Sequence, residues 1–187
     1  MKSTVDILVP YWLRISQIHD ITKELYIRSE EYSYELKSFL QPVKELKDAY
    51  EHVVRASTRA FCNTPNNDDI VYIKANMEKA VGHEYRAFFD TADFLCITLR
   101  NRIISRLESF QYNQILIVWS EYEKARERII TITEDIASIR LKKDVGSSDK
   151  MCDLIFEYKG IVEELIKYYI KIDLEVYPEL EKRYRRI

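Results

Sequence analysis

Apolar residues recur every three or four positions along most of the chain, which is the spacing of amphipathic helices. The first run extends from near Val9 to Phe39, and Pro10 suits a first helical turn because its missing N–H is not needed there. Proline disfavours helix at the residue before it, so Pro42 predicts a corner near Gln41 and a second helix after it. The core positions expected for the second helix are Val43, Leu46, Tyr50, Val53, Ser57 and Ala60.

The clearest break in the pattern is the segment 63–69, which reads Asn-Thr-Pro-Asn-Asn-Asp-Asp. Asparagine and aspartate cap helix N-termini, so this segment predicts the start of a third helix. Its apolar stripe continues from Ile70 to Leu107, with Gly82 as the only weak helix former. A helix of nearly 40 residues would be about 60 Å long, whereas a compact globule of this size has a radius of gyration of about 16 Å. The sequence therefore predicts an elongated molecule.

Two further runs complete the pattern. The fourth is one unbroken stripe from Ile115 to Ile139, and the fifth runs from Leu154 to Val176, followed by a kink or a short extra helix at Pro178. A turn is expected at 145–149, Val-Gly-Ser-Ser-Asp, where a glycine can end one helix and serine or aspartate can cap the next. The predicted fold is all-α: an elongated bundle of about five long amphipathic helices with coiled-coil-like packing, in a single domain over residues 1–187.

Composition narrows the class of protein. Only 3 glycines and 4 prolines occur, so turns are few, and 29 basic against 31 acidic residues leave no overall attraction for nucleic acid or anionic lipid. Three widely separated cysteines suit neither a disulfide framework nor a zinc site. No apolar run approaches the ~18 residues of a membrane span, and Asp6 and Arg14 interrupt the first one. We expect a cytoplasmic protein that does not enter membranes.

A polar stripe crosses the apolar middle of the third predicted helix. His83, Arg86, Asp90 and Asp93 are spaced three and four residues apart, so they share one face, and their apolar surroundings predict that they are buried. The structural interpretation is an ion pair between Arg86 and Asp90. The functional alternative is that the stripe joins His52 in a metal or acid–base site. No histidine lies in a Glu-x-x-His or His-Glu-x-x-His motif, so we predict neither a metal nor a cofactor.

Residues 47–52, Lys-Asp-Ala-Tyr-Glu-His, and residues 14–19, Arg-Ile-Ser-Gln-Ile-His, each place four residues between a basic residue and a histidine. In this spacing they resemble the motif of the HEPN family of helical, usually dimeric ribonucleases. Lys47 replaces the family's arginine in the first segment, and Ile15 follows the arginine of the second, where the family has a polar residue. The resemblance implies a nuclease or a nucleic-acid-associated protein, active or degenerate. Its site would comprise His52, Lys47, Arg55 and Arg59.

A basic patch near the end of the sequence could bind phosphate or an acidic protein, or could be the solvated last turn of a helix. It consists of Lys182, Arg183, Arg185 and Arg186.

The apolar residues of the fourth predicted helix exceed what one neighbouring helix can cover. Leu116, Ile117, Trp119 and Ile130 lie off the main stripe, which favours self-association or a protein partner. We therefore predict a non-enzymatic interaction or assembly protein, a small subunit or accessory partner of a larger complex and a homo-oligomer. The alternative is the HEPN-like protein.

Overall fold

The structure is a computed structural model that describes residues 4–33, 39–62, 66–142 and 148–184, with only the backbone described for Cys62 and residues 148–150. Within these residues every regular element is a helix, and the helices pack against one another, so the predicted all-α fold is confirmed. The chain divides into two compact units, Met1–Phe94 and Leu95–Ile187, and helix α3 contributes to both. The single domain expected over residues 1–187 stays a prediction.

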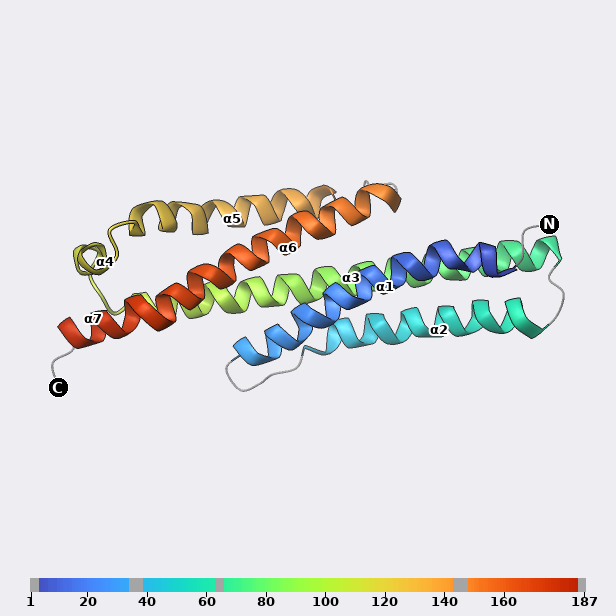
Figure 1. The fold of residues 1–187 in the computed structure, drawn as a ribbon, viewed down its shortest axis with the longest axis horizontal. Helices are drawn as coiled ribbons and strands as arrows, with labels where there is room; N and C mark the ends of the chain where they lie inside the picture. The colour runs from blue at the N-terminus through green and yellow to red at the C-terminus, as the bar shows by residue number, and fades with distance from the viewer. Residues whose placement is uncertain (1–3, 34–38, 63–65, 143–147, 185–187) are drawn as a thin grey trace. The chain divides into compact units, whose positions relative to one another are not determined.

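Unit 1 contains α1 (Thr4–Tyr32), α2 (Leu40–Cys62) and the first part of α3 (Asn67–Leu107). The three helices alternate in direction (Figure 1). Small alanines on α2 allow the helices to approach closely, while α1 and α3 contribute larger side chains. The buried residues include Ile15, Ile18 and Leu25 of α1, Ala49, Val53, Ala56 and Ala60 of α2, and Ile73, Met77 and Phe88 of α3.

Helix α1 starts at Thr4, so the predicted start near Val9 is wrong. Pro10 lies inside the helix, where the missing N–H removes one hydrogen bond near the N-terminus and the surrounding turns continue. The predicted end is wrong as well, because α1 ends at Tyr32 and Phe39 lies before α2, with its ring stacked on that of Phe94 at 5.0 Å. The remaining residues of that prediction, 34–38, lie outside the described part of the chain.

The start of α2 at Leu40 confirms the second helix, but its buried face is rotated from the predicted one. Val43 and Tyr50 are exposed, whereas Glu45 and Ala49 are buried. Only the position of the neighbouring helices decides between two adjacent stripes of one helix, and here the small side chains face inward.

The third helix begins and ends as its sequence predicts. Asn66 accepts a hydrogen bond from the backbone N–H of Asp69 at 2.9 Å, and the carboxylate of Asp69 accepts one from the backbone N–H of Asn66 at 3.0 Å. This reciprocal cap satisfies two N–H groups at the helix start. Helix α3 then continues without interruption to Leu107.

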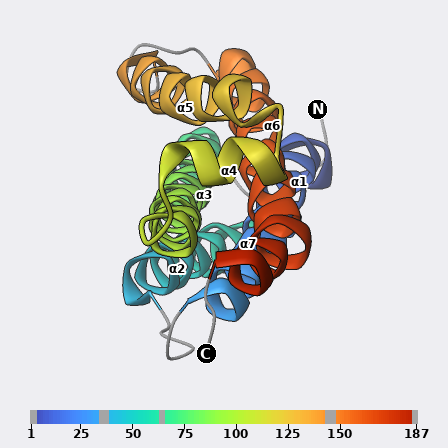
Figure 2. The same cartoon turned by 90° about the vertical axis from the view of Figure 1, so that its left-hand side faces the viewer.

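Unit 2 contains the last part of α3, α4 (Tyr112–Val118), α5 (Tyr122–Lys142), α6 (Ser148–Lys171), the π-helical turn η1 (Ile172–Val176) and α7 (Tyr177–Tyr184). Figure 2 looks along the axis of α3 and shows α4 side-on, so α4 crosses the end of α3 at a steep angle. The π-helical turn precedes Pro178, which cannot donate a backbone hydrogen bond to Leu174. The break expected at Pro178 is thus a change of helix type.

The fourth predicted helix is wrong as a single element, because α4 and α5 are separate. The backbone of Trp119 is extended, with φ −133° and ψ 91°, and its side chain is buried. The Trp119 ring lies 5.7 Å from that of Tyr122 and 5.2 Å from Nζ of Lys171. Burying this large ring redirects the chain, although the apolar spacing runs unbroken across the site.

Candidate functional sites

All 3 histidines of the chain lie in unit 1, and each bonds across an interface between α3 and another helix. The bonds join Nδ1 of His19, His52 and His83 to Glu84, Asn76 and Glu45 at 3.2, 2.9 and 2.8 Å. Helix α3 therefore carries a line of polar side chains towards both of its neighbours in this unit. Each histidine ring is oriented by its partner.

Glu45 is the centre of the cluster between α2 and α3. Its Oε2 accepts hydrogen bonds from Nδ1 of His83 and from Nε of Arg86, both at 2.8 Å, and its Oε1 accepts one from Gln41 at 3.3 Å. Nη2 of Arg86 also lies 2.6 Å from Nδ1 of His83. Since a neutral ring nitrogen either donates or accepts, the Nδ1–H form of His83 serves the carboxylate and leaves Arg86 to bond Glu45 through Nε.

Burial raises the pKa of Glu45, but the hydrogen bonds from Arg86 and His83 together lower it by more than burial raises it. The pKa of this carboxyl therefore lies below its ordinary value. Glu45 is 9% exposed, whereas the side chain of Arg86 is 52% exposed. The cluster therefore holds an ionised carboxylate at a buried position and keeps the balancing guanidinium at the surface. This arrangement favours a structural role for the carboxylate.

The rings of His52 and His83 stack at 5.3 Å with 21° between their planes. Asn76 donates its amide to the carbonyl of Tyr72 at 2.9 Å, which leaves its Oδ1 to accept from His52. With Nδ1 used in both rings, each Nε2 could take a proton or a metal. Across the ranges that the structure describes, however, no three His, Cys, Asp or Glu side chains lie close enough to hold a metal ion.

A second carboxylate, Glu84 of α3, is buried, and its Oε1 lies 3.2 Å from Nδ1 of His19 of α1. Burial raises the pKa of Glu84, and the charge and hydrogen bond of His19 oppose the rise. The sequence contained a signal for the burial of Glu84 that we did not use: the residues three and four positions away from it on α3 are apolar. These neighbours are Ala80, Val81, Ala87 and Phe88, all buried.

Only part of the predicted polar stripe belongs to the Glu45 cluster. His83 and Arg86 join Glu45, an acceptor on another helix, whereas Asp90 and Asp93 lie further along α3. The expectation that the stripe is buried is wrong: Arg86 is exposed, and His83, Asp90 and Asp93 are half-buried. The stripe lies at the edge of the packed face of α3, so its longer side chains reach solvent.

The residues of the HEPN-like alternative do not share one partner. The partners are Glu51 for Lys47 and Arg55, at 3.2 and 3.5 Å, Asp69 for Arg59, and Asn76 for His52. Three basic groups that would contact phosphate are thus paired with carboxylates.

Of the predicted basic patch, Lys182 and Arg183 both pair with Glu179 of α7, at 3.7 and 2.6 Å. Arg185 and Arg186 lie outside the described residues. Pairing within one helix, as in the described half of the patch, is typical of a solvated helix end.

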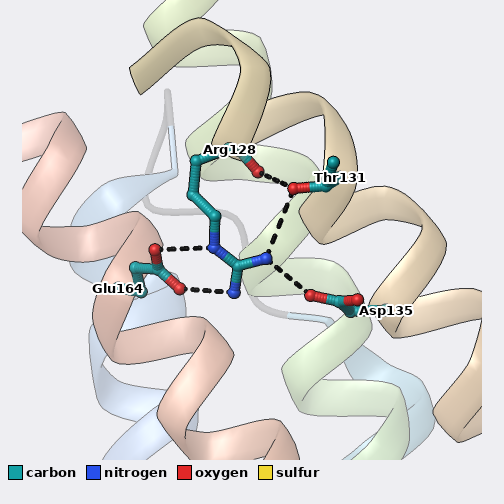
Figure 3. A network of polar contacts seen from close by, with 4 residues as sticks. All are labelled: Arg128, Thr131, Asp135 and Glu164. Carbon is teal, nitrogen blue, oxygen red and sulfur yellow. Dashed lines mark hydrogen bonds and ion pairs between the residues drawn. The ribbon is translucent and has the colours of Figure 1, made fainter. Parts of the chain in front are cut away.

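Unit 2 contains a polar network that the sequence did not reveal. Arg128 of α5 donates to both carboxylate oxygens of Glu164 of α6, at 2.8 and 2.7 Å, and also to Asp135 at 2.7 Å and Thr131 at 3.3 Å (Figure 3). The hydrogen bonds to Glu164 and Asp135 raise the pKa of Arg128. Because two parallel N–H···O bonds fix both distance and orientation, the network sets how α5 lies against α6.

Unit 2 also contains a groove of about 690 Å³ between the end of α3 and α5, with Tyr112 and Ile115 of α4 among its lining residues. Its floor and walls are mostly apolar. Ile104 of α3 and Ile130 of α5 stand on its walls and are 59% and 55% exposed. The other apolar and aromatic lining residues are Ile103, Leu107, Phe110, Tyr112, Ile115, Tyr122 and Ile129.

No helix among the described residues is long and apolar enough to cross a membrane. No family model matches this chain, and no curated protein or solved structure is significantly similar to it. The class of protein is therefore defined by its all-α fold, and its function must be argued from its sites.

Proposed function

We propose that this chain is a non-enzymatic interaction protein that binds another protein chain through the groove between α3 and α5. The observation that carries the proposal is the pair of exposed isoleucines, Ile104 and Ile130, on the walls of an apolar groove of about 690 Å³. An α-helix with one apolar face is the natural occupant of such a groove between two helices.

The energetic argument rests on the exposed apolar surface. Burying an exposed isoleucine stabilises a complex by roughly 1–2 kcal/mol, and here two face the same groove. The aromatic rings of Tyr112 and Tyr122, 5.7 Å apart, lie at the end near α4. Aromatic side chains at the end of an apolar groove suit a protein interface, since such residues carry much of the binding energy in known interfaces.

The clusters of unit 1 favour structural roles over catalysis. Each histidine is bonded to a partner on another helix, and Lys47, Arg55 and Arg59 pair with carboxylates. A phosphate would have to displace those carboxylates to be bound. We therefore prefer binding to the HEPN-like alternative.

The test compares two substitutions on the same helix. Ile104→Glu places a charge in the groove, whereas Ile97→Glu changes an isoleucine of α3 that is 46% exposed and outside the groove. Purified, immobilised versions of each variant and of the unaltered protein are incubated with extract of the source cells. We expect proteins captured by the unaltered chain to be retained by Ile97→Glu and lost from Ile104→Glu.

Equal capture by both variants would show that the groove is not the binding site. The catalytic alternative is tested separately by incubating the protein and a His52→Ala variant with RNA. Cleavage that is lost in His52→Ala would contradict a binding-only function.

A further inference from the structure

We infer that the partner bound in the groove between α3 and α5 is an amphipathic α-helix that carries opposite charge orders on the two edges of its apolar face. One edge has an acidic residue followed about two turns later by a basic residue, and the other edge has a basic residue followed by an acidic one. This inference rests on the proposed function, because it gives the chemistry of the partner of the same groove. The order of charges along the two walls supports it.

Both walls carry the same series of side chains. Each has an arginine, an isoleucine four residues later and a glutamate four residues after that, a spacing that places all three on one helix face. Glu108 follows the last residue of α3, but its backbone N–H donates to the carbonyl of Ile104 at 2.8 Å, so the helical path continues to it. The six residues, which all line the groove, are Arg100, Ile104 and Glu108 on the α3 wall and Arg126, Ile130 and Glu134 on the α5 wall.

The two walls run in opposite directions (Figure 1). At one end of the groove, Nη1 of Arg100 donates to Oγ1 of Thr133 at 2.8 Å, which places this arginine beside the glutamate end of the α5 wall. At the other end the rings of Tyr112 and Tyr122 lie 5.7 Å apart. These tyrosines lie four residues after the glutamate of the α3 wall and four residues before the arginine of the α5 wall. Each end of the groove therefore has one arginine and one glutamate, on opposite walls.

The four charges are available to a partner. Among the described residues Glu108, Arg126 and Glu134 form no ion pair, and all three are exposed. Arg100 is half-buried, and its hydrogen bond to Thr133 is to a neutral hydroxyl. Pairing with a partner thus gains attraction without breaking an existing ion pair. The isoleucines supply the apolar contact, and the charges select the partner.

A helix in the groove turns one edge towards each wall. If it runs parallel to α3, the edge on the α3 wall meets Arg100 first and Glu108 second, so this edge needs an acidic and then a basic residue. The edge on the α5 wall meets Glu134 first and Arg126 second, so it needs the reverse order. The charges of each wall are eight residues apart, which is about 12 Å or two turns of the partner helix. A helix that runs the other way has the same requirement, because a half turn about the normal to the groove exchanges both the walls and the ends.

A helix with the same charge order on both edges does not meet this requirement. One of its edges attracts a wall and the other is repelled, whichever way it runs. The groove therefore distinguishes partner helices by the relation between their two edges, since the total charge of the partner is the same in both cases.

The first test uses four synthetic helical peptides of identical composition, each with one stripe of leucines and with two glutamates and two lysines on its edges. Two peptides are crossed: they have opposite charge orders on the two edges, and they differ by exchange of the edges. The other two are uncrossed, with the same order on both edges, either acidic first or basic first. In the groove one crossed peptide makes four attractive contacts, the other makes four repulsive contacts, and each uncrossed peptide makes two of each kind.

Binding is measured by fluorescence anisotropy of the labelled peptides at low salt, because salt screens exposed charges. We expect the two crossed peptides to be the tightest and the weakest of the set, with dissociation constants about tenfold or more apart, and the uncrossed peptides to lie between them. Ile104→Glu should abolish binding of the tightest peptide, whereas Ile97→Glu, which lies outside the groove, should not.

The second test reverses one wall with the double variant Arg126→Glu and Glu134→Arg. Both uncrossed peptides should now bind more tightly than both crossed peptides, because each makes four attractive contacts in one of the two directions. Differences in helix content among the peptides cannot produce this exchange of rank, since the same four peptides are used with both proteins. Circular dichroism of each protein variant checks that the exposed substitutions leave its helices intact.

The outcomes separate this inference from the proposed function. Equal binding of the four peptides, a rank order that the double variant leaves unchanged, binding that Ile104→Glu does not affect, or no binding at all would each overturn the charge order. If the peptides fail but Ile104→Glu still loses a protein captured from cell extract, groove binding stands and its partner has another chemistry. If the captured proteins are also unaffected, both proposals fail.

Discussion

Replacing Glu45 by glutamine tests whether the cluster between α2 and α3 stabilises unit 1. The change keeps the shape of the side chain and removes its charge. Glu45 is 9% exposed and accepts hydrogen bonds from His83 and Arg86, both at 2.8 Å. Glutamine would leave one neutral oxygen facing both donors, and its amide nitrogen would take the place of Oε1, which accepts a hydrogen bond from Gln41.

The expected loss follows from the exposure of each donor. The His83 side chain is 18% exposed, so its N–H loses a charged acceptor with little access to water, which costs about 1–3 kcal/mol. Arg86 is largely exposed and is rehydrated at small cost. We expect Glu45→Gln to lower the free energy of unfolding at pH 7 by about 2 kcal/mol, measured by urea titration followed by circular dichroism.

The pH dependence adds a second check. Because the pKa of Glu45 in the fold is below its ordinary value of 4.5, its stabilising contribution is fully present above pH 4.5 and is lost as the pH falls through the lower folded pKa. The difference between the variant and the unaltered protein should therefore shrink in acid. The control is Glu51→Gln on the same helix, at an exposed ion pair, which should leave the unfolding free energy close to that of the unaltered protein. A loss below ~0.5 kcal/mol for Glu45→Gln, or an equal loss for the control, would refute the reasoning.

Three other predictions concern single side chains. Arg128→Gln removes the bidentate bond to Glu164 and should lower the unfolding free energy in urea by about 1 kcal/mol, and no change would mean that the network does not hold α5 to α6. Glu84→Gln should raise the free energy of unfolding at neutral pH. Burial raises the pKa of Glu84, so the stability of the unaltered protein falls as the pH rises from 4.5 through the raised pKa, and the variant lacks this fall. A variant that is less stable than the unaltered protein at pH 7 would contradict this prediction. Trp119→Ala should lower the free energy of unfolding, measured with heat or urea, by about 3 kcal/mol because the ring is 5% exposed. Trp119→Phe should lower it much less, because the indole N–H has no partner among the described residues. Similar losses for the two variants would refute this reasoning.

Local physical chemistry determined the helical elements of this chain. The third helix was predictable over Asn67–Leu107 because its apolar spacing, its Asn66 cap and its lack of proline all depend on neighbours within four residues. The same local information misplaced the start of α1, because a proline near a helix N-terminus is tolerated both in the first turn and just inside it. It also missed the break at Trp119, across which the apolar spacing is continuous.

Tertiary structure decided the partners of the polar side chains. The sequence suggested Asp90 as the partner of Arg86 because the two are four residues apart, but the carboxylate that Arg86 bonds belongs to Glu45, 41 positions away on another helix. Likewise the groove depends on how α3 and α5 pack, although Ile104 and Ile130 on its two walls are present in the sequence. Spacing along one helix determines which side chains share a face. Only packing determines what that face contacts. Such a contact joins segments that are far apart in the sequence, and the periodic pattern within one helix gives no information about it.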